Sequence, residues 1–105
     1  MYKYDHIGII LKEPREGMTH YPELKVWTSQ YDKNEFRIEF VCFDEGADYH
    51  PLIKSMSHVG FVVENIDEAI KNRKVLKKPT AFGNIKFAFI EDNGVPVEFF
   101  QLSES

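Results

Sequence analysis

The sequence predicts a single α+β domain made of two related units, and three observations lead to this prediction. A His-apolar-Gly-apolar motif occurs twice, as HIGI at residues 6–9 and as HVGF at residues 58–61. A strand-like run with Glu before Phe follows each copy, as IEFV at 38–41 and VEFF at 97–100. The chain of 105 residues is 43% apolar and contains nine Phe and five Tyr, which is enough for one hydrophobic core. The repeat therefore indicates paired units inside one domain.

Residues 57–102 form the better-defined second unit, for which we predict the order β-α-β-β-β. Asn65 is a favourable helix cap, and Asp67 and Glu68 suit the positive end of the helix dipole. A short helix should therefore begin here and end near residues 72–74. Asn93 and Gly94 make the preferred two-residue hairpin turn. The expected strands cover residues 57–64, 75–79, 84–91 and 95–102.

Residues 1–45 form a shortened first unit, which we expect to lack the helix and one strand of the second unit. Pro14, Gly17 and Pro22 argue against regular structure, so residues 12–22 should be a loop. A second irregular segment, residues 44–56, connects the two units. The expected strands of the first unit, rich in β-branched and aromatic residues, cover residues 3–11, 24–31 and 35–43.

Charge and composition exclude several classes of function. The net charge is −4 without a basic face, so no nucleic-acid partner is expected. Cys42 is the single cysteine, so no internal disulfide can form, which favours a reducing environment. No apolar run is long enough to span a bilayer, and residues 1–6 are too polar for a signal peptide. We expect a soluble, cytoplasmic protein with no membrane partner, and its small size favours a homodimer.

Two histidines and two glutamates stand at matching places in the two units. If the units pack as related halves, these side chains converge at the interface between them. Neutral imidazole and carboxylate groups suit a divalent ion such as zinc, nickel, cobalt, iron or manganese. Gly8 and Gly60 follow the histidines on the same strand faces, and we expect them to leave room for a ligand. The candidate metal ligands are His6, Glu39, His58 and Glu98.

These motifs resemble those of the vicinal oxygen chelate superfamily, which includes glyoxalase I, methylmalonyl-CoA epimerase, extradiol dioxygenases and the bleomycin and fosfomycin resistance proteins. The resemblance is carried by DHIGI at 5–9, SHVGFVVENIDEAI at 57–70 and AFIEDNGVPVEFFQ at 88–101. With RIEFVCF at 37–43 and HPLIKSMSHVGF at 50–61, the chain looks most like short, uncharacterised bacterial members. The resemblance implies paired βαβββ units that form a curved mixed-sheet cup around a metal ion.

In glyoxalase-like members each unit supplies one His and one Glu to the metal, and all four positions are filled here. Dioxygenase-like and fosfomycin-resistance members use two His and one Glu, so Glu39 argues against them. The resemblance implies a lyase or isomerase acting on a small substrate with adjacent oxygens, whose enediolate the metal stabilises as a Lewis acid. Glu98 or Glu39 would remove the proton α to the carbonyl. Arg37 and Phe100 are the candidate substrate-binding residues.

Some assignments stay open at this point. Glu35 shares the strand face of Glu39, so a register shift of one pair would exchange the two. His20 and His50 fall in predicted loops and are expected at the surface. Cys42 faces away from Glu39 by strand alternation and is expected to be a small buried residue.

A function from a different class also fits the sequence. Members of the bleomycin-resistance kind hold a drug in an aromatic cup and need no metal, whereas this chain keeps all four candidate ligands. The aromatic residues that could line such a cup are Trp27, Phe61, Phe87, Phe89, Phe99, Phe100 and the tyrosines.

Overall fold

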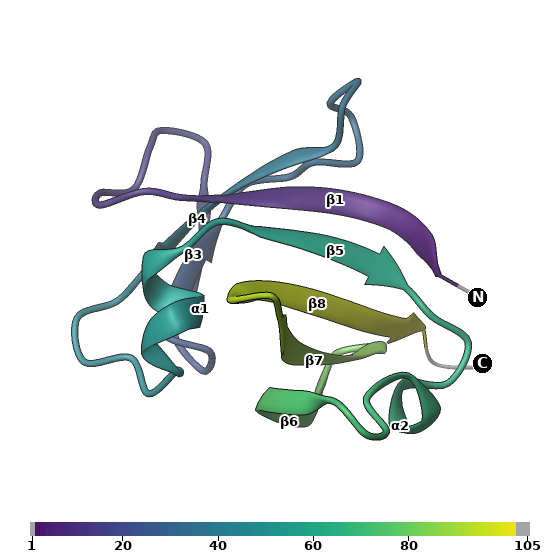
Figure 1. Ribbon diagram of the computed structural model, residues 1–105. Coiled ribbons are helices and arrows are strands. Elements are labelled where there is room, and N and C mark those ends of the chain that lie inside the picture. The colour runs from purple at the N-terminus through teal and green to yellow at the C-terminus, as the bar shows by residue number, and fades with distance from the viewer. Residues whose placement is uncertain (1, 103–105) are drawn as a thin grey trace.

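The computed structural model describes residues 2–102, which form one eight-stranded mixed sheet with two short helices (Figure 1). The strands lie in the order β2-β3-β4-β1-β5-β8-β7-β6. This curved sheet with few helices confirms the predicted α+β cup. The elements are β1 Lys3–Ile10, β2 Thr19–Tyr21, β3 Val26–Thr28, β4 Ile38–Phe43, α1 Pro51–Ser55, β5 His58–Val62, α2 Ile66–Ala69, β6 Lys74–Phe82, β7 Ile85–Asp92 and β8 Val95–Leu102.

The two halves of the sheet repeat one arrangement. In the first half β1 runs parallel to β4, and in the second half β5 runs parallel to β8. The remaining strands of each half add on in antiparallel pairs, which gives the matching orders β1-β4-β3-β2 and β5-β8-β7-β6. β1 and β5 pair antiparallel and join the halves at the middle of the sheet, where Figure 1 shows them with β8 beside them.

The first unit has all four strands, so the prediction that one strand is missing is wrong. β2 lies inside the predicted loop and pairs with β3, but each strand is only three residues long. Such a short strand, placed after Pro14 and Gly17, has no room to show an alternating pattern. The predicted loss of the helix is correct, since residues 11–18 of the described chain contain none.

In the second unit, Asn65 caps α2 as predicted, because its side chain accepts a hydrogen bond from the Glu68 backbone N–H at 3.1 Å. The helix ends at Ala69, earlier than expected, and Asn72 takes a positive φ of 62° just beyond it. β6 continues through Pro79 instead of ending there. It is an edge strand with two register shifts, and an edge is the place in a sheet that tolerates proline.

The connector contains α1, which was not predicted from sequence. The His50 side chain caps it by accepting from the Leu52 backbone N–H at 3.0 Å, and Pro51 occupies the first turn, where a missing N–H costs nothing. Ile53 is fully buried and packs against Phe87 and Phe89 on the inner face of β7. The connector is therefore part of the wall of the cup.

β7 alternates between the two sides of the sheet. Phe87 and Phe89 face the inside of the cup, and Ala88 and Ile90 face the opposite side. On that outer side α2 contributes Ile66 and others to a second buried cluster, which consists of Val63, Ile66, Ala69, Ala88, Ile90 and Phe99. None of the helices formed by residues 2–102 is long and apolar enough to cross a membrane.

The sheet curls far enough for its two edge strands to touch. Tyr21 on β2 and Phe82 on β6 stand edge to face, with ring centroids 5.4 Å apart. These strands lie at opposite ends of the strand order, so this contact narrows the cup across its width. A cavity consequently lies inside the curve, beside the central strands.

Candidate metal centre

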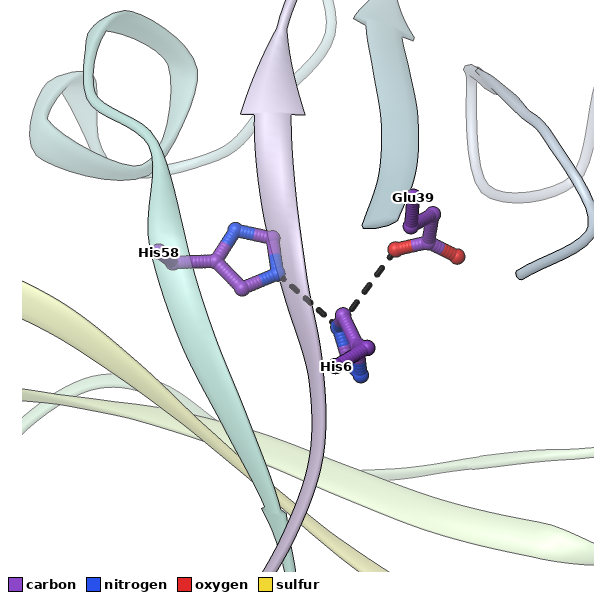
Figure 2. Close-up of side chains that lie close together, drawn as sticks. All are labelled: His6, Glu39 and His58. Carbon is purple, nitrogen blue, oxygen red and sulfur yellow. Dashed lines mark hydrogen bonds and ion pairs between the residues drawn. The ribbon is translucent and has the colours of Figure 1, made fainter. Parts of the chain in front are cut away.

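The four predicted ligands lie on the four central strands of the sheet. His6 is on β1, Glu39 on β4, His58 on β5 and Glu98 on β8. Strand pairing places Gly8 opposite Glu39 and Gly60 opposite Glu98, so the two units present their carboxylates in equivalent positions. Figure 2 shows His6, His58 and Glu39 approaching one another from three neighbouring strands.

The ligand atoms are spaced as ligands of one ion would be. His6, Glu39 and His58 each offer an atom within 4.8 Å of the others. The two imidazole Nε2 atoms are 3.3 Å apart, and Glu39 Oε1 is 3.5 Å from His6 Nε2. Glu98 Oε1 is 3.1 Å from both Nε2 atoms. Ligands about 2.0–2.2 Å from a shared ion are separated by roughly 3.0–3.6 Å, so this donor set fits a divalent metal.

Gly8 and Gly60 leave room for the histidine rings and not for a bound ligand, contrary to the expectation from sequence. A Cβ at Gly8 would come within 2.2 Å of Cε1 of His58, and one at Gly60 within 2.3 Å of Cε1 of His6. Pairing of β1 with β5 sets each glycine opposite the histidine of the other unit. Each imidazole therefore lies over the glycine of the opposite half.

His6 is held by Asp5, a residue that the sequence analysis did not single out. His6 Nδ1 lies 2.8 Å from Asp5 Oδ2, which also accepts a hydrogen bond from the Tyr31 hydroxyl at 2.5 Å. This carboxylate fixes the imidazole with Nδ1 protonated and Nε2 directed at the other ligands, an arrangement that supports metal-ligating histidines in general. The Tyr31 ring stacks on the imidazole at 4.7 Å.

Strand alternation predicts that Asp5 points away from the candidate site, because neighbouring residues in a regular strand point to opposite faces. The register of β1 against β5 shifts between Tyr4 and His6, which marks a β-bulge at Asp5. The bulge allows the side chains of Asp5 and His6 to be buried together. An Asp directly before a candidate His was the available signal.

Arg37 is engaged by Asp5. Its Nε donates to the Asp5 carbonyl oxygen, and its Nη2 donates to Asp5 Oδ1 at 3.2 Å. Arg37 has a positive φ of 55° and precedes β4, although the sequence placed it inside the predicted strand 35–43. Glu35 is exposed in the turn before β4, and Glu39 is the residue beside His6.

The second histidine is supported differently. His58 Nε2 lies 3.1 Å from Glu98 Oε1, but its Nδ1 is buried without a hydrogen-bond partner among the described residues. Ser57, at the position matching Asp5, accepts instead from the backbone N–H of Ile10 at 3.3 Å. The two units thus supply matching ligands with unequal support.

Burial and mutual charge set the protonation of the cluster. Burial opposes charge on His6, but the hydrogen bonds that it donates to Asp5 and Glu98 raise its pKa to about 10. Burial, followed by the nearby charge of Glu98, raises the pKa of Glu39 to about 8. Burial also acts to raise the pKa of Glu98, but hydrogen bonds from His58 and His6 hold it below the ordinary value. Without a metal, the proton on His6 offsets the carboxylate charge.

A cavity of about 220 Å³ adjoins the cluster and is lined by Glu39, His58 and Glu98 at one end. Phe100, predicted to bind substrate, lines this cavity and lies 5.4 Å from the His6 ring between centroids. Arg37 lines a second hollow of about 320 Å³ that shares Tyr31 and Glu39 with the first.

His20, which was predicted to lie in a surface loop, lies instead on β2 and is paired with Asp44 at 2.7 Å. Cys42 is buried, as expected.

Solved structures share this architecture. No protein-family model matches the sequence, and no curated protein does. The hypothetical protein BH1468 from Bacillus halodurans C-125 is 18% identical, with a TM-score of 0.65 over 99% of this chain and 96% of that one. Methylmalonyl-CoA epimerase from Mycobacterium tuberculosis is 14% identical, with a TM-score of 0.67 over 97% of this chain and 89% of that one.

At these identities the likeness concerns the fold. The chain shares the paired-unit cup fold of these two structures, and this is the fold that its motifs predicted. The candidate metal cluster lies where the two units of this fold meet.

Proposed function

We propose that the chain is a divalent-metal-dependent lyase or isomerase of the glyoxalase kind, acting on a small substrate with adjacent oxygens. The observation that carries the proposal is the cluster of His6, Glu39 and His58 beside a cavity, with Glu98 3.1 Å from both imidazole Nε2 atoms. All four residues would hold the ion. A bound divalent ion supplies Lewis-acid stabilisation of the negative charge that develops on substrate oxygens.

The two carboxylates suit different tasks. Glu98 accepts from both imidazoles and has a lowered pKa, so it stays ionised and is the better ligand. Glu39 lines both the cavity and the adjoining hollow, where a substrate could meet it, and in the metal-free protein burial raises its pKa to about 8. We assign removal of the proton α to the carbonyl to Glu39. This assignment rests on the residues of this chain, and the epimerase shares the same fold.

Elemental analysis of untagged protein tests the metal site. About one equivalent of a divalent metal is expected in the parent chain and much less in His58→Ala and Glu98→Ala. His20→Ala is the matched control, since it removes an imidazole that pairs with Asp44 outside the cluster. A parent chain that holds no metal after reconstitution with nickel, zinc, cobalt, iron or manganese would disprove the proposal.

Hydrogen–deuterium exchange at the substrate's α carbon, followed by NMR in D₂O, tests the chemistry. 2-Oxo aldehyde adducts and acyl thioesters are the first compounds to screen. Glu39→Gln should bind the compound yet lose most of the exchange, because the amide cannot accept the proton. Equal exchange in the parent and in Glu39→Gln would remove Glu39 from the role of base.

A metal-free binding protein of the bleomycin-resistance kind is the second candidate, favoured by the aromatic lining of the cavity. If the chain is such a binding protein, ligands should raise its melting temperature by the same amount with and without chelator. If it is the proposed enzyme, this rise should depend on metal. The same melting experiment therefore separates the two functions.

A further inference from the structure

The cavity beside the metal centre has a wall of aromatic rings. Eight of the side chains that line it are Phe or Tyr. Three of these rings reach the cluster itself. Phe89 stands edge to face with His58 at 5.1 Å, and Tyr31 and Phe100 lie 4.7 Å and 5.4 Å from the His6 ring between centroids. A substrate group attached next to the chelating oxygens would therefore contact rings immediately.

Two of the tyrosine hydroxyls of this wall are already used within the protein. The Tyr31 hydroxyl donates to Asp5 Oδ2, and the Tyr49 hydroxyl donates to the Leu24 carbonyl oxygen at 2.8 Å. These two tyrosines therefore turn ring surface, and not a free hydrogen-bond donor, towards the cavity. A polar substrate group placed against these two rings would lose its water without replacement, which is costly.

The cavity also lacks a positive charge to bind an anionic group. Among the described residues that line it, none is Lys or Arg, and its acidic residues are Glu39 and Glu98. The ammonium of Lys77 lies 4.7 Å from the Tyr49 ring centroid and 5.8 Å from that of Phe87, but Lys77 is not a lining residue. Apart from the proposed metal ion, a phosphate held inside the cavity would have no cationic partner there.

We infer that the group attached to the substrate's adjacent oxygens is a compact, uncharged apolar group of about the size of a phenyl ring, and not a phosphate-bearing or otherwise anionic one. This inference rests on the proposed metal site and specifies its substrate class. The cavity volume of about 220 Å³ limits the size of the attached group. A ligand of this class must keep its oxygens at the metal and place its apolar part among the rings.

Three hydroxamates test the inference, because they share a chelating pair of adjacent oxygens and differ in the attached group. Benzohydroxamate carries a phenyl ring, acetohydroxamate a methyl group and phosphoglycolohydroxamate a phosphate. Calorimetric titration of the metal-loaded protein should give at least about tenfold tighter binding of benzohydroxamate than of acetohydroxamate, as burial of a ring predicts. Phosphoglycolohydroxamate should bind no better than acetohydroxamate.

Equal affinities for the phenyl and methyl compounds would overturn the inference, as would a preference for the phosphate compound. Elemental analysis of the same samples keeps the two claims apart. Bound metal with no preference for the ring leaves the proposed function standing and removes this substrate class. Absence of metal removes the proposed function and, with it, the inference.

A cavity-filling variant provides a second readout. Val26 lines the cavity from β3, a strand that carries none of the four candidate ligands, and Val26→Phe should occupy the space for the ring. We expect benzohydroxamate affinity to fall to that of acetohydroxamate, with metal content and acetohydroxamate affinity unchanged. Unchanged benzohydroxamate affinity in a folded variant would overturn the inference. If the variant does not fold, the three-compound comparison on the parent decides alone.

Discussion

Gly60 is the residue whose replacement tests the geometry of the cluster most directly. An alanine there places its Cβ 2.3 Å from Cε1 of His6, so the buried imidazole must move. We expect Gly60→Ala to lose about 1–3 kcal/mol of unfolding free energy through overpacking, and to lose metal. Urea unfolding and elemental analysis measure the two effects.

A double variant gives the matched control. His6→Ala removes the ring that the new methyl group strikes, so Gly60→Ala should cost much less stability in the His6→Ala background than in the parent. Additive losses in the two backgrounds would contradict the contact between Gly60 and His6.

Asp5 is expected to control metal affinity without touching the metal. Asp5→Asn keeps the size of the side chain but removes the charge that holds the His6 Nδ1 proton. Loss of such a supporting carboxylate weakens metal binding by about 10- to 100-fold. Competition with a chromophoric chelator measures this affinity. Asp44→Asn, at the His20 pair, is the control and should bind metal as the parent does.

Metal binding should strengthen as pH rises, because the ligands must lose protons. In the metal-free fold the pKa of Glu39 is raised from 4.5 to about 8, and that of His6 from 6.5 to about 10. A raised folded-state pKa stabilises the protein below the ordinary value, and this stabilisation disappears as pH approaches the folded value. The metal-free protein should therefore lose stability from pH 6 to 9, while the benefit from added metal grows.

Thermal melts with metal or with chelator at each pH measure that benefit. Glu39→Gln should lose the part of the pH dependence that ends near 8, since the glutamine cannot titrate. A metal-induced shift in melting temperature that stays constant from pH 6 to 9 would contradict the prediction.

The residues of the cluster could be predicted from sequence because the repeat supplies them in pairs. His6 and His58 open matching strands, and Glu39 and Glu98 follow in matching strands. Asp5 could not be predicted, because a bulge breaks the alternation on which strand predictions depend.

At the scale of single elements, the cap of α2 offers a clean measurement. Asn65→Ala removes the acceptor for the Glu68 backbone N–H and should lower the unfolding free energy by about 1 kcal/mol. Asn65→Asp keeps an acceptor at this place and should retain most of the stability. Metal content should not change in either variant, because α2 packs on the outer side of the sheet. A loss of metal with Asn65→Ala would contradict this separation.

Long strands with clear patterns were predictable, and short or interrupted elements were not. β7 and β8 have eight residues each and a favoured Asn-Gly turn between them. β2 has three residues, and β6 is held in the sheet across Pro79 by its partner β7, so tertiary pairing overrides the local signal. α1 is stabilised by the burial of Ile53 against β7, and this tertiary contact leaves no pattern in the local sequence.

At the scale of the whole molecule, a homodimer remains our prediction. The edge strands do not favour edge-to-edge pairing, since β2 is short and β6 carries lysines, a proline and register shifts. The outer face of β1 is the better candidate, because no helix covers the first unit there and Tyr4 and Ile7 are 45% and 37% exposed.

Light scattering after size-exclusion chromatography should therefore give a dimer for the parent and a shift towards monomer for Ile7→Lys. Ile7→Val, which keeps the apolar surface, should stay dimeric. A parent that is monomeric at all concentrations would disprove the homodimer.

The interlocked glycines and imidazoles also limit how the two halves can diverge during evolution. At most positions one half can change without a matching change in the other. The helix that is present in one half, but absent from the described residues of the other, is an example. At Gly8 and Gly60 this independence ends, because a larger residue in one half displaces the histidine of the other. These two positions should accept change only jointly with the opposite histidine, so a lineage that abandons the metal in one unit also frees the glycine in its counterpart.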